Sequence, residues 1–178
     1  MPLLKETAIK PDTEIQNLID SVVEDAKVQW APLLYEGSYP ENGFGISELR
    51  VKHVPGYGGS YWGSSHFWSE SITASNTFEA WINGTMTDMA YVLVEGVFNR
   101  EAVPKVYEIA PKARGNDLPT INIEQMYTLD IARIWFEKPF AVGPNNDLQI
   151  QNKGDNTGIE RIGLLGHCIA KRAYLIVR

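Results

Sequence analysis

The clearest pattern of apolar and polar positions lies near the C-terminus, where two strand-like segments flank a corner. Leu148 and Ile150 point to one face, while the glutamines that alternate with them point to the other. Alternation with a period of two is typical of a strand buried on one face only. The preceding residues 143–146 (Gly-Pro-Asn-Asn) supply turn chemistry, because Pro fixes φ and Asn tolerates the left-handed conformation. The pattern predicts an antiparallel pair joined by a tight turn.

An amphipathic helix is predicted near the N-terminus, at residues 13–28. Its apolar side chains recur at the spacing of one helix face, and they are Ile15, Leu18, Ile19, Val22, Val23 and Ala26. Thr13 and Gln16 have the spacing of a capping box, and Pro32 marks where the helix must have ended. The apolar face has to be covered, either by the body of the same chain, which we favour, or by a partner.

After residue 45 the periodicity changes from that of a helix to that of strands. Short strands recur at intervals of roughly ten residues, separated by Gly, Pro and Asn, which is typical of a sandwich or barrel. The predicted strands are Ser47–Val54, His66–Thr73, Thr77–Asn83, Met89–Phe98, Lys105–Ala110, Thr120–Glu124, Ala132–Phe140, Leu148–Asn152, Arg161–Ala170 and Ala173–Val177. Nothing in the order suggests strands alternating with helices, so a parallel sheet is not expected.

We therefore predict an all-β fold, an antiparallel β-sandwich of the jelly-roll type with a short N-terminal α-helix. Residues 1–35 would form an extension that carries the helix, and residues 36–178 the jelly-roll domain. Residues 111–117 (Pro-Lys-Ala-Arg-Gly-Asn-Asp) would form a long crossover loop between strands.

Composition excludes some classes of function. The net charge is −6 and the pI is near 5.1, which argues against nucleic acid and anionic membranes as partners. No apolar run approaches the length of about 18 residues that spans a bilayer, and the N-terminus lacks the pattern of a signal peptide. Cys168 is the single cysteine, so no intrachain disulfide is expected, and its apolar neighbours indicate a small buried side chain.

A search for catalytic chemistry finds no local motif. His53, His66 and His167 do not form a His-x-His or His-Glu-x-x-His pair, so we expect no metal, cofactor or catalytic residue. His167 and Cys168 would point to opposite faces of a strand and cannot act together. Carboxylates in strand-like segments are expected to face water, although a sandwich hydrolase could use a pair of them. These carboxylates are Glu70, Glu79, Glu95, Glu108, Glu124 and Glu137.

The most distinctive local feature is the segment Val54–Trp68, which combines glycines with aromatic residues. Tyr57, Tyr61 and Trp62, together with Trp81 further on, are our candidate binding residues. Such rings stack on sugars or anchor a protein partner. The other interpretation, which stays open, is that the glycines permit tight bends and the aromatic rings plug one end of the sandwich.

The C-terminal half resembles a known family in its Phe136–Ile150 segment, in Asn156-Thr157-Gly158 and in Ile162–Gly166. An aromatic-Pro-Phe approach, a Pro-Asn-Asn turn, an alternating strand and a closing Leu-Leu-Gly strand are similar to single-jelly-roll capsid and decoration proteins of tailless icosahedral viruses of prokaryotes. The resemblance covers residues 70–178. It implies self-assembly into a virion lattice and brings no catalytic residue with it.

We expect, on this basis, a non-enzymatic virion structural protein, a capsid or decoration subunit. Its partners would be further copies of itself and other virion proteins, and it would reside in the virion after assembly in the host cytoplasm. No direct contact with nucleic acid is expected. The alternative is a carbohydrate-binding β-sandwich module or receptor-binding spike, with a glycan as the partner of the loop aromatics.

Overall fold

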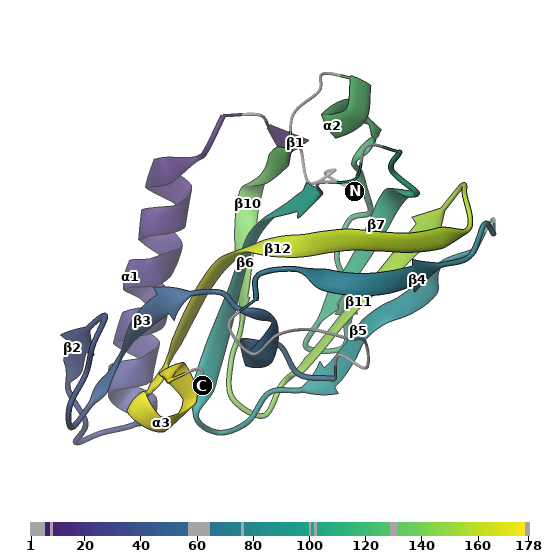
Figure 1. Cartoon of the computed structure of the whole chain (residues 1–178). Helices are drawn as coiled ribbons and strands as arrows, with labels where there is room; N and C mark the ends of the chain where they lie inside the picture. The colour runs from purple at the N-terminus through teal and green to yellow at the C-terminus, as the bar shows by residue number, and fades with distance from the viewer. Residues whose placement is uncertain are drawn as a thin grey trace.

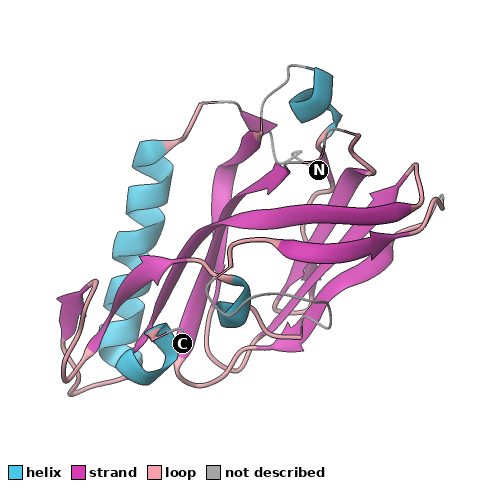
Figure 2. Cartoon of the chain, viewed as in Figure 1, coloured by secondary structure: helices cyan, strands magenta, loops and turns pink. Residues whose placement is uncertain are grey.

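The fold is a β-sandwich with a helix near the N-terminus, as the sequence predicts (Figures 1 and 2). The computed structural model describes residues 6–7, 9–56, 65–75, 77–99, 101, 103–128 and 132–176. Two sheets pack face to face, and a long helix lies outside one of them.

The larger sheet has seven strands within the described residues. Its main path runs, in order, through β1 (Glu6–Thr7), β10 (Arg133–Val142), β6 (Ala90–Asn99), β12 (Gly158–Lys171), β3 (Phe44–Glu48) and β2 (Tyr35–Gly37). The strand β4 (Trp68–Ile72) pairs with the first part of the long β12, on the side where β3 pairs with its last part. All these pairs are antiparallel except β2 with β3.

The smaller sheet has five strands within the same described part of the chain. They are β5 (Glu79–Thr85), β11 (Asp147–Gly154), β7 (Val106–Ala113) and β8 (Asn116–Asp117) in that order, with β9 (Ile121–Asn122) also beside β7. From β4 on, the chain passes repeatedly between the sheets, so that β10-β6-β12-β4 faces β5-β11-β7-β9. This order is consistent with the jelly roll, which interlocks two Greek keys.

The main core lies between the two sheets and explains the alternation in the sequence. Leu148 and Ile150 of β11 are fully buried there, which confirms the predicted strand. Residues 144–145 form the turn before β11, and Asn145 adopts a φ of 59° as the turn chemistry predicts. The Trp68 and Trp81 rings meet edge to face in this core, with centroids 5.6 Å apart.

Helix α1 (Asp12–Gln29) covers part of the outer face of the larger sheet, which confirms the interpretation that its own chain covers it. Its buried Val22, Val23 and Ala26 pack with Tyr91 and Leu93 of β6. The helix begins after Pro11, and in the described structure no side chain caps its first turn, so the predicted Thr13–Gln16 capping box is wrong. All ten residues of β6 are buried: the smaller sheet covers one face, and α1 packs on Tyr91 and Leu93 of the other.

Three predicted segments differ from the structure. Residues 111–117 form no crossover loop; β7 continues to Ala113, and Arg114 and Gly115, both at positive φ, turn the chain into β8. The predicted strand Ser47–Val54 stops at Glu48, and a short 3-10 helix η1 (Val51–His53) follows. The predicted strand Thr120–Glu124 is reduced to β9, followed by α2 (Glu124–Thr128).

The last predicted strand, Ala173–Val177, is also wrong, because residues 172–175 form the helical turn α3 (Arg172–Leu175). Tyr174 and Leu175 both pack against the main core. Neighbouring residues of a strand would point to opposite faces, so a helical turn is what lets both reach the same core.

Candidate functional site

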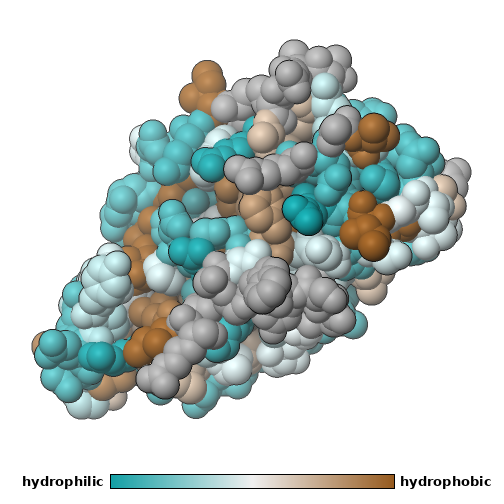
Figure 3. All heavy atoms as spheres, viewed as in Figure 1, coloured by the Kyte–Doolittle hydropathy of each residue, from teal (hydrophilic) through white to brown (hydrophobic). Residues whose placement is uncertain are grey.

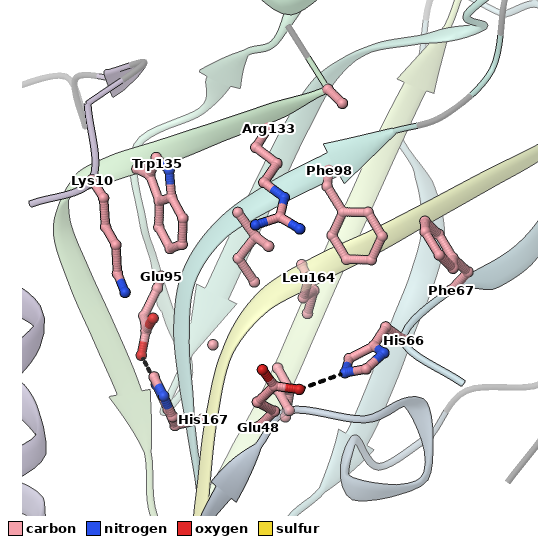
Figure 4. Close-up of a pocket in the computed structure, with 14 residues that line it drawn as sticks. Lys10, Glu48, His66, Phe67, Glu95, Phe98, Arg133, Trp135, Leu164 and His167 are labelled. Carbon is pink, nitrogen blue, oxygen red and sulfur yellow. Dashed lines mark hydrogen bonds and ion pairs between the residues drawn. The ribbon is translucent and has the colours of Figure 1, made fainter. Parts of the chain in front are cut away.

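A pocket opens on the outer face of the larger sheet, in the part of that face beside α1 (Figure 4). Its volume is about 580 Å³, which is within the range of small-molecule sites. Its walls come from segments far apart in the sequence: Lys10, Glu48, Leu49, His66, Phe67, Glu95, Phe98, Ala132, Arg133, Trp135, Leu164, Leu165, Gly166 and His167.

A bulge in the middle of the larger sheet shapes the floor of this pocket. On β6, Val94 pairs with Gly166 of β12 and Gly96 pairs with Leu165, so Glu95 between them has no partner in the register of the described strands. Bulges of this kind redirect side chains and occur often beside active sites. A Cβ atom at Gly166 would collide with the carbonyl oxygen of Leu93, so the close approach of the strands requires glycine there.

The bulge directs Glu95 to His167, and the two side chains form a hydrogen bond through Nδ1 of the imidazole. The Glu95 side chain is only 2% exposed, whereas that of His167 is 26% exposed and borders the pocket. An ionised Glu95 fixes the tautomer of His167, because its carboxylate accepts a hydrogen bond and Nδ1 must carry the proton to donate it. The other ring nitrogen, Nε2, has no hydrogen-bond partner among the described residues and is left for a ligand.

A second His–Glu pair stands across the pocket and is far more exposed (Figure 4). Nε2 of His66 lies 3.1 Å from Glu48, whose side chain is 70% exposed. Nη1 of Arg50 lies 3.0 Å from Nδ1 of His66, and Nη2 lies 3.6 Å from Glu48. Because guanidinium can only donate, Nδ1 accepts and Nε2 of a neutral His66 donates to Glu48.

Aromatic rings and cations complete the pocket. Phe67 and Phe98 meet edge to face at 4.3 Å, and Nζ of Lys10 lies 5.4 Å from the centre of the Trp135 ring. The Arg133 side chain extends into the pocket between Trp135 and Phe98 (Figure 4). An aromatic surface beside cations and hydrogen-bonding groups suits a small polar ligand with one apolar face.

Of the residues that the sequence singles out as candidate binding groups, Trp81 alone lies in the part of the chain that the structure describes. Tyr57, Tyr61 and Trp62 lie outside the described residues. Trp81 is only 4% exposed and packs on Trp68 in the main core, so it supports the sandwich rather than a binding surface. The segment 57–64 ends next to Ser65 and His66, and His66 lines the pocket.

Local sequence patterns miss this site because its members meet only through the sheet. Glu95 and His167 are 72 positions apart, and Glu48 and His66 belong to separate segments. The expectation that Glu95 faces water is wrong, since the bulge turns it toward His167. The one available signal is a carboxylate inside a long apolar strand, in Tyr-Val-Leu-Val-Glu-Gly-Val-Phe.

The burial of Cys168 agrees with the prediction from the sequence. Cys168 is fully buried on the face opposite His167, and burial raises the pKa of its thiol. Among the described residues, no group of three or more His, Cys, Asp or Glu side chains is arranged to hold a metal ion. The described helices include none that is long and apolar enough to cross a membrane.

Comparison of the chain with protein-family models, with curated proteins and with solved structures finds no match.

Proposed function

We propose that the chain is a non-enzymatic structural subunit of a virion, a capsid or decoration protein that associates with further copies of itself and with other virion proteins. The observation that carries the proposal is an apolar edge of the sandwich. Leu34 and Tyr39 flank the edge strand β2 and are 71% and 93% exposed, and Val28 near the end of α1 is 82% exposed. Apolar surface is visible at the end of the molecule that carries β2 and α3 (Figure 3).

The edge has the physical character of an association surface. Within the described residues β2 is the last strand of its sheet, so its outer backbone groups have no neighbouring strand. Exposed edges and apolar patches favour pairing with another chain. A lattice of such subunits, assembled in the host cytoplasm and kept in the virion, would cover both the edge and the apolar side chains beside it.

The test is the mass of the purified protein in solution over a concentration series, by light scattering, with negative-stain images of the same samples. We expect discrete oligomers or shell-like particles, and we expect Leu34→Ser with Tyr39→Ser to shift the series toward monomer. Ile159→Ser is the matched control, because Ile159 is 68% exposed on β12, outside this edge. A monomer at every concentration, or equal effects of the two variants, would contradict the proposal.

We propose as a second candidate that the chain is a carbohydrate-binding module or receptor-binding spike. The specific observation in favour is the pocket on the outer face, which presents Trp135 and Phe98 beside polar side chains. In the sequence, Tyr57, Tyr61 and Trp62 precede His66, which lines that pocket, by fewer than ten positions. Intrinsic fluorescence titrated with a glycan panel tests it: sugar stacking should change the emission of the wild type and much less that of Trp135→Ala. No response to any glycan would contradict this candidate.

A further inference from the structure

Among the described residues around the pocket, Arg133 is a cation without a counterion. Glu48 is engaged by His66 and Arg50, and Glu95 is engaged by His167. Lys10 lies 3.7 Å from Asp12. Among the described residues no carboxylate pairs with Arg133, although its side chain extends into the pocket (Figure 4). A guanidinium in this setting offers two parallel donors, the arrangement that binds a carboxylate most specifically.

The surface next to Arg133 suits the flat, apolar face of a sugar ring. Arg133 and Trp135 come from the same face of β10, two residues apart, and Figure 4 shows both side chains in the pocket. The half-buried indole of Trp135 provides a stacking surface, and the Phe67–Phe98 pair closes the far wall. Rings with C–H faces stack on such surfaces while their substituents reach the polar rim.

The remaining polar groups match the hydroxyls of the same ring. Nε2 of His167 accepts a hydrogen bond from one hydroxyl group while Nδ1 donates to Glu95, and the exposed carboxylate of Glu48 accepts hydrogen bonds from others. The pocket thus holds acceptors for hydroxyl groups, one aromatic surface, and the Arg133 guanidinium, whose N–H donors have no carboxylate partner among the described residues. A neutral sugar would use the first two and leave the guanidinium without a partner.

We propose that the pocket binds a sugar acid, a pyranose that carries a carboxylate, with Arg133 on the carboxylate and Trp135 on the ring. The proposal rests on the second candidate function, that the chain binds carbohydrate, and it names the class of sugar. A carboxylate on the ligand would supply the counterion that no described residue provides for Arg133.

Matched pairs of methyl glycosides test the proposal on the full chain by calorimetric titration. Glucuronic acid is compared with glucose, and galacturonic acid with galactose, since each pair differs only at C6, which is a carboxylate in the acid and a hydroxymethyl group in the neutral sugar. Acetate is titrated in parallel. We expect at least one acid to bind about tenfold or more tighter than its neutral partner, as a charge-assisted hydrogen-bonded pair allows. We expect acetate to bind more weakly than the sugar acid that shows this preference.

Two substitutions assign the preference to a residue. Arg133→Ala should abolish the preference for the acid and keep the affinity for the neutral sugar, and Arg133→Lys should restore only part of it. Arg161→Ala, at an exposed arginine of β12 outside the pocket, should keep the wild-type preference. Circular dichroism of each variant confirms that it is folded.

The outcomes separate the two proposals. Equal binding of acids and neutral sugars, or a preference that survives Arg133→Ala, overturns the sugar-acid inference and leaves carbohydrate binding in place. Absence of binding by every sugar overturns both. Acetate that binds as tightly as the sugar acids would reveal a simple anion site and overturn the role of Trp135.

Discussion

Glu95 and His167 are hydrogen-bonded across neighbouring strands although they are not register partners. His167 lies opposite Leu93, and Glu95 is the extra residue of the β6 bulge. The bulge lets a carboxylate from a buried strand reach the one histidine of β12 that borders the pocket. Among the described residues, the buried Glu95 carboxylate has His167 as its one hydrogen-bond partner, whereas the Glu48 carboxylate of the other pair is exposed to solvent.

That difference predicts unequal costs of removing the two imidazoles. His167→Ala leaves the buried Glu95 carboxylate without its partner, which should lower the free energy of unfolding by about 1–3 kcal/mol or more. His66→Ala removes a bond to the exposed Glu48, which should cost less than about 1 kcal/mol. Urea denaturation at neutral pH measures both, and equal losses in the two variants would contradict the interpretation of Glu95 as a dependent buried acceptor.

His53 predicts a dependence of stability on pH. The residue is 1% exposed, its Nδ1 accepts the backbone N–H of Arg50 at 3.1 Å, and its ring stacks on Tyr174. Burial, which disfavours the charged imidazolium, is the main reason that the pKa of His53 is lowered from 6.5 to about 4, and the nearby charges of Arg50 and Lys52 contribute to the same shift. The unfolded chain therefore binds a proton between these two values that the folded chain does not.

The consequence is stability that is fully present above pH 6.5 and is lost as the pH falls toward 4. The contribution of His53 is roughly 3 kcal/mol over this window. His53→Asn keeps a side-chain acceptor for the Arg50 N–H but cannot titrate, so its unfolding free energy should change less between pH 7 and 4.5. Parallel pH profiles of the wild type and this variant would remove His53 as the cause.

Replacing one carboxylate oxygen of Glu160 should have a large effect on the stability of the fold. Its carboxylate is fully buried and accepts hydrogen bonds from the backbone N–H of Lys105 at 2.7 Å and of Val106 at 2.8 Å. It also accepts one from the side chain of Asn99 at 2.7 Å. In Glu160→Gln an amide NH₂ faces one of these donors, so the free energy of unfolding should fall by about 1–3 kcal/mol.

Glu137→Gln is the matched control for Glu160, because Glu137 is exposed on β10. It should change the free energy of unfolding by less than about 0.5 kcal/mol. Chemical denaturation of both variants gives the comparison. A Glu160→Gln protein as stable as the control would mean that the buried oxygens contribute little to holding residues 105–106 against β12.

Trp62 and Trp81 are both candidate binding residues in the sequence, but their replacement by alanine should have different effects on stability and binding. Trp81→Ala removes a ring from the core and should lower the free energy of unfolding by about 3–5 kcal/mol. Trp62→Ala should weaken assembly or glycan capture without unfolding the domain. Denaturation, light scattering and glycan titration of each variant check this, and loss of binding without loss of stability in Trp81→Ala would contradict it.

Elements with a strong local period could be predicted from the sequence, and elements that tertiary packing decides could not. The alternation around Leu148 and the apolar face of α1 are both expressed in neighbouring residues, so β11 and the helix are where the sequence predicts them. Residues 173–177 also have strand-like composition, yet Tyr174 and Leu175 gain a common core contact only in a helical turn.

The pocket could not be predicted for a related reason. Each member is ordinary in its own segment, and the pairing of β6 with β12 is what brings Glu95 to His167. Local composition favours the aromatic segment 57–62 as a binding site and favours solvent exposure for the carboxylates in strands. The extra residue in the β6 bulge reverses the direction in which the Glu95 side chain points, and the composition of the segment does not indicate where such a bulge occurs.

The burial of β6 on both faces has a consequence for how the chain opens. Because β10 and β12 flank β6 and α1 packs on its Tyr91 and Leu93, loosening of an edge strand does not bring solvent to the amides of this part of β6. The amide protons of Val92 and Leu93 should therefore exchange with deuterium only when the whole domain unfolds, and their exchange rates would report global stability directly. Amides of the edge strand β2 would exchange through small fluctuations long before that.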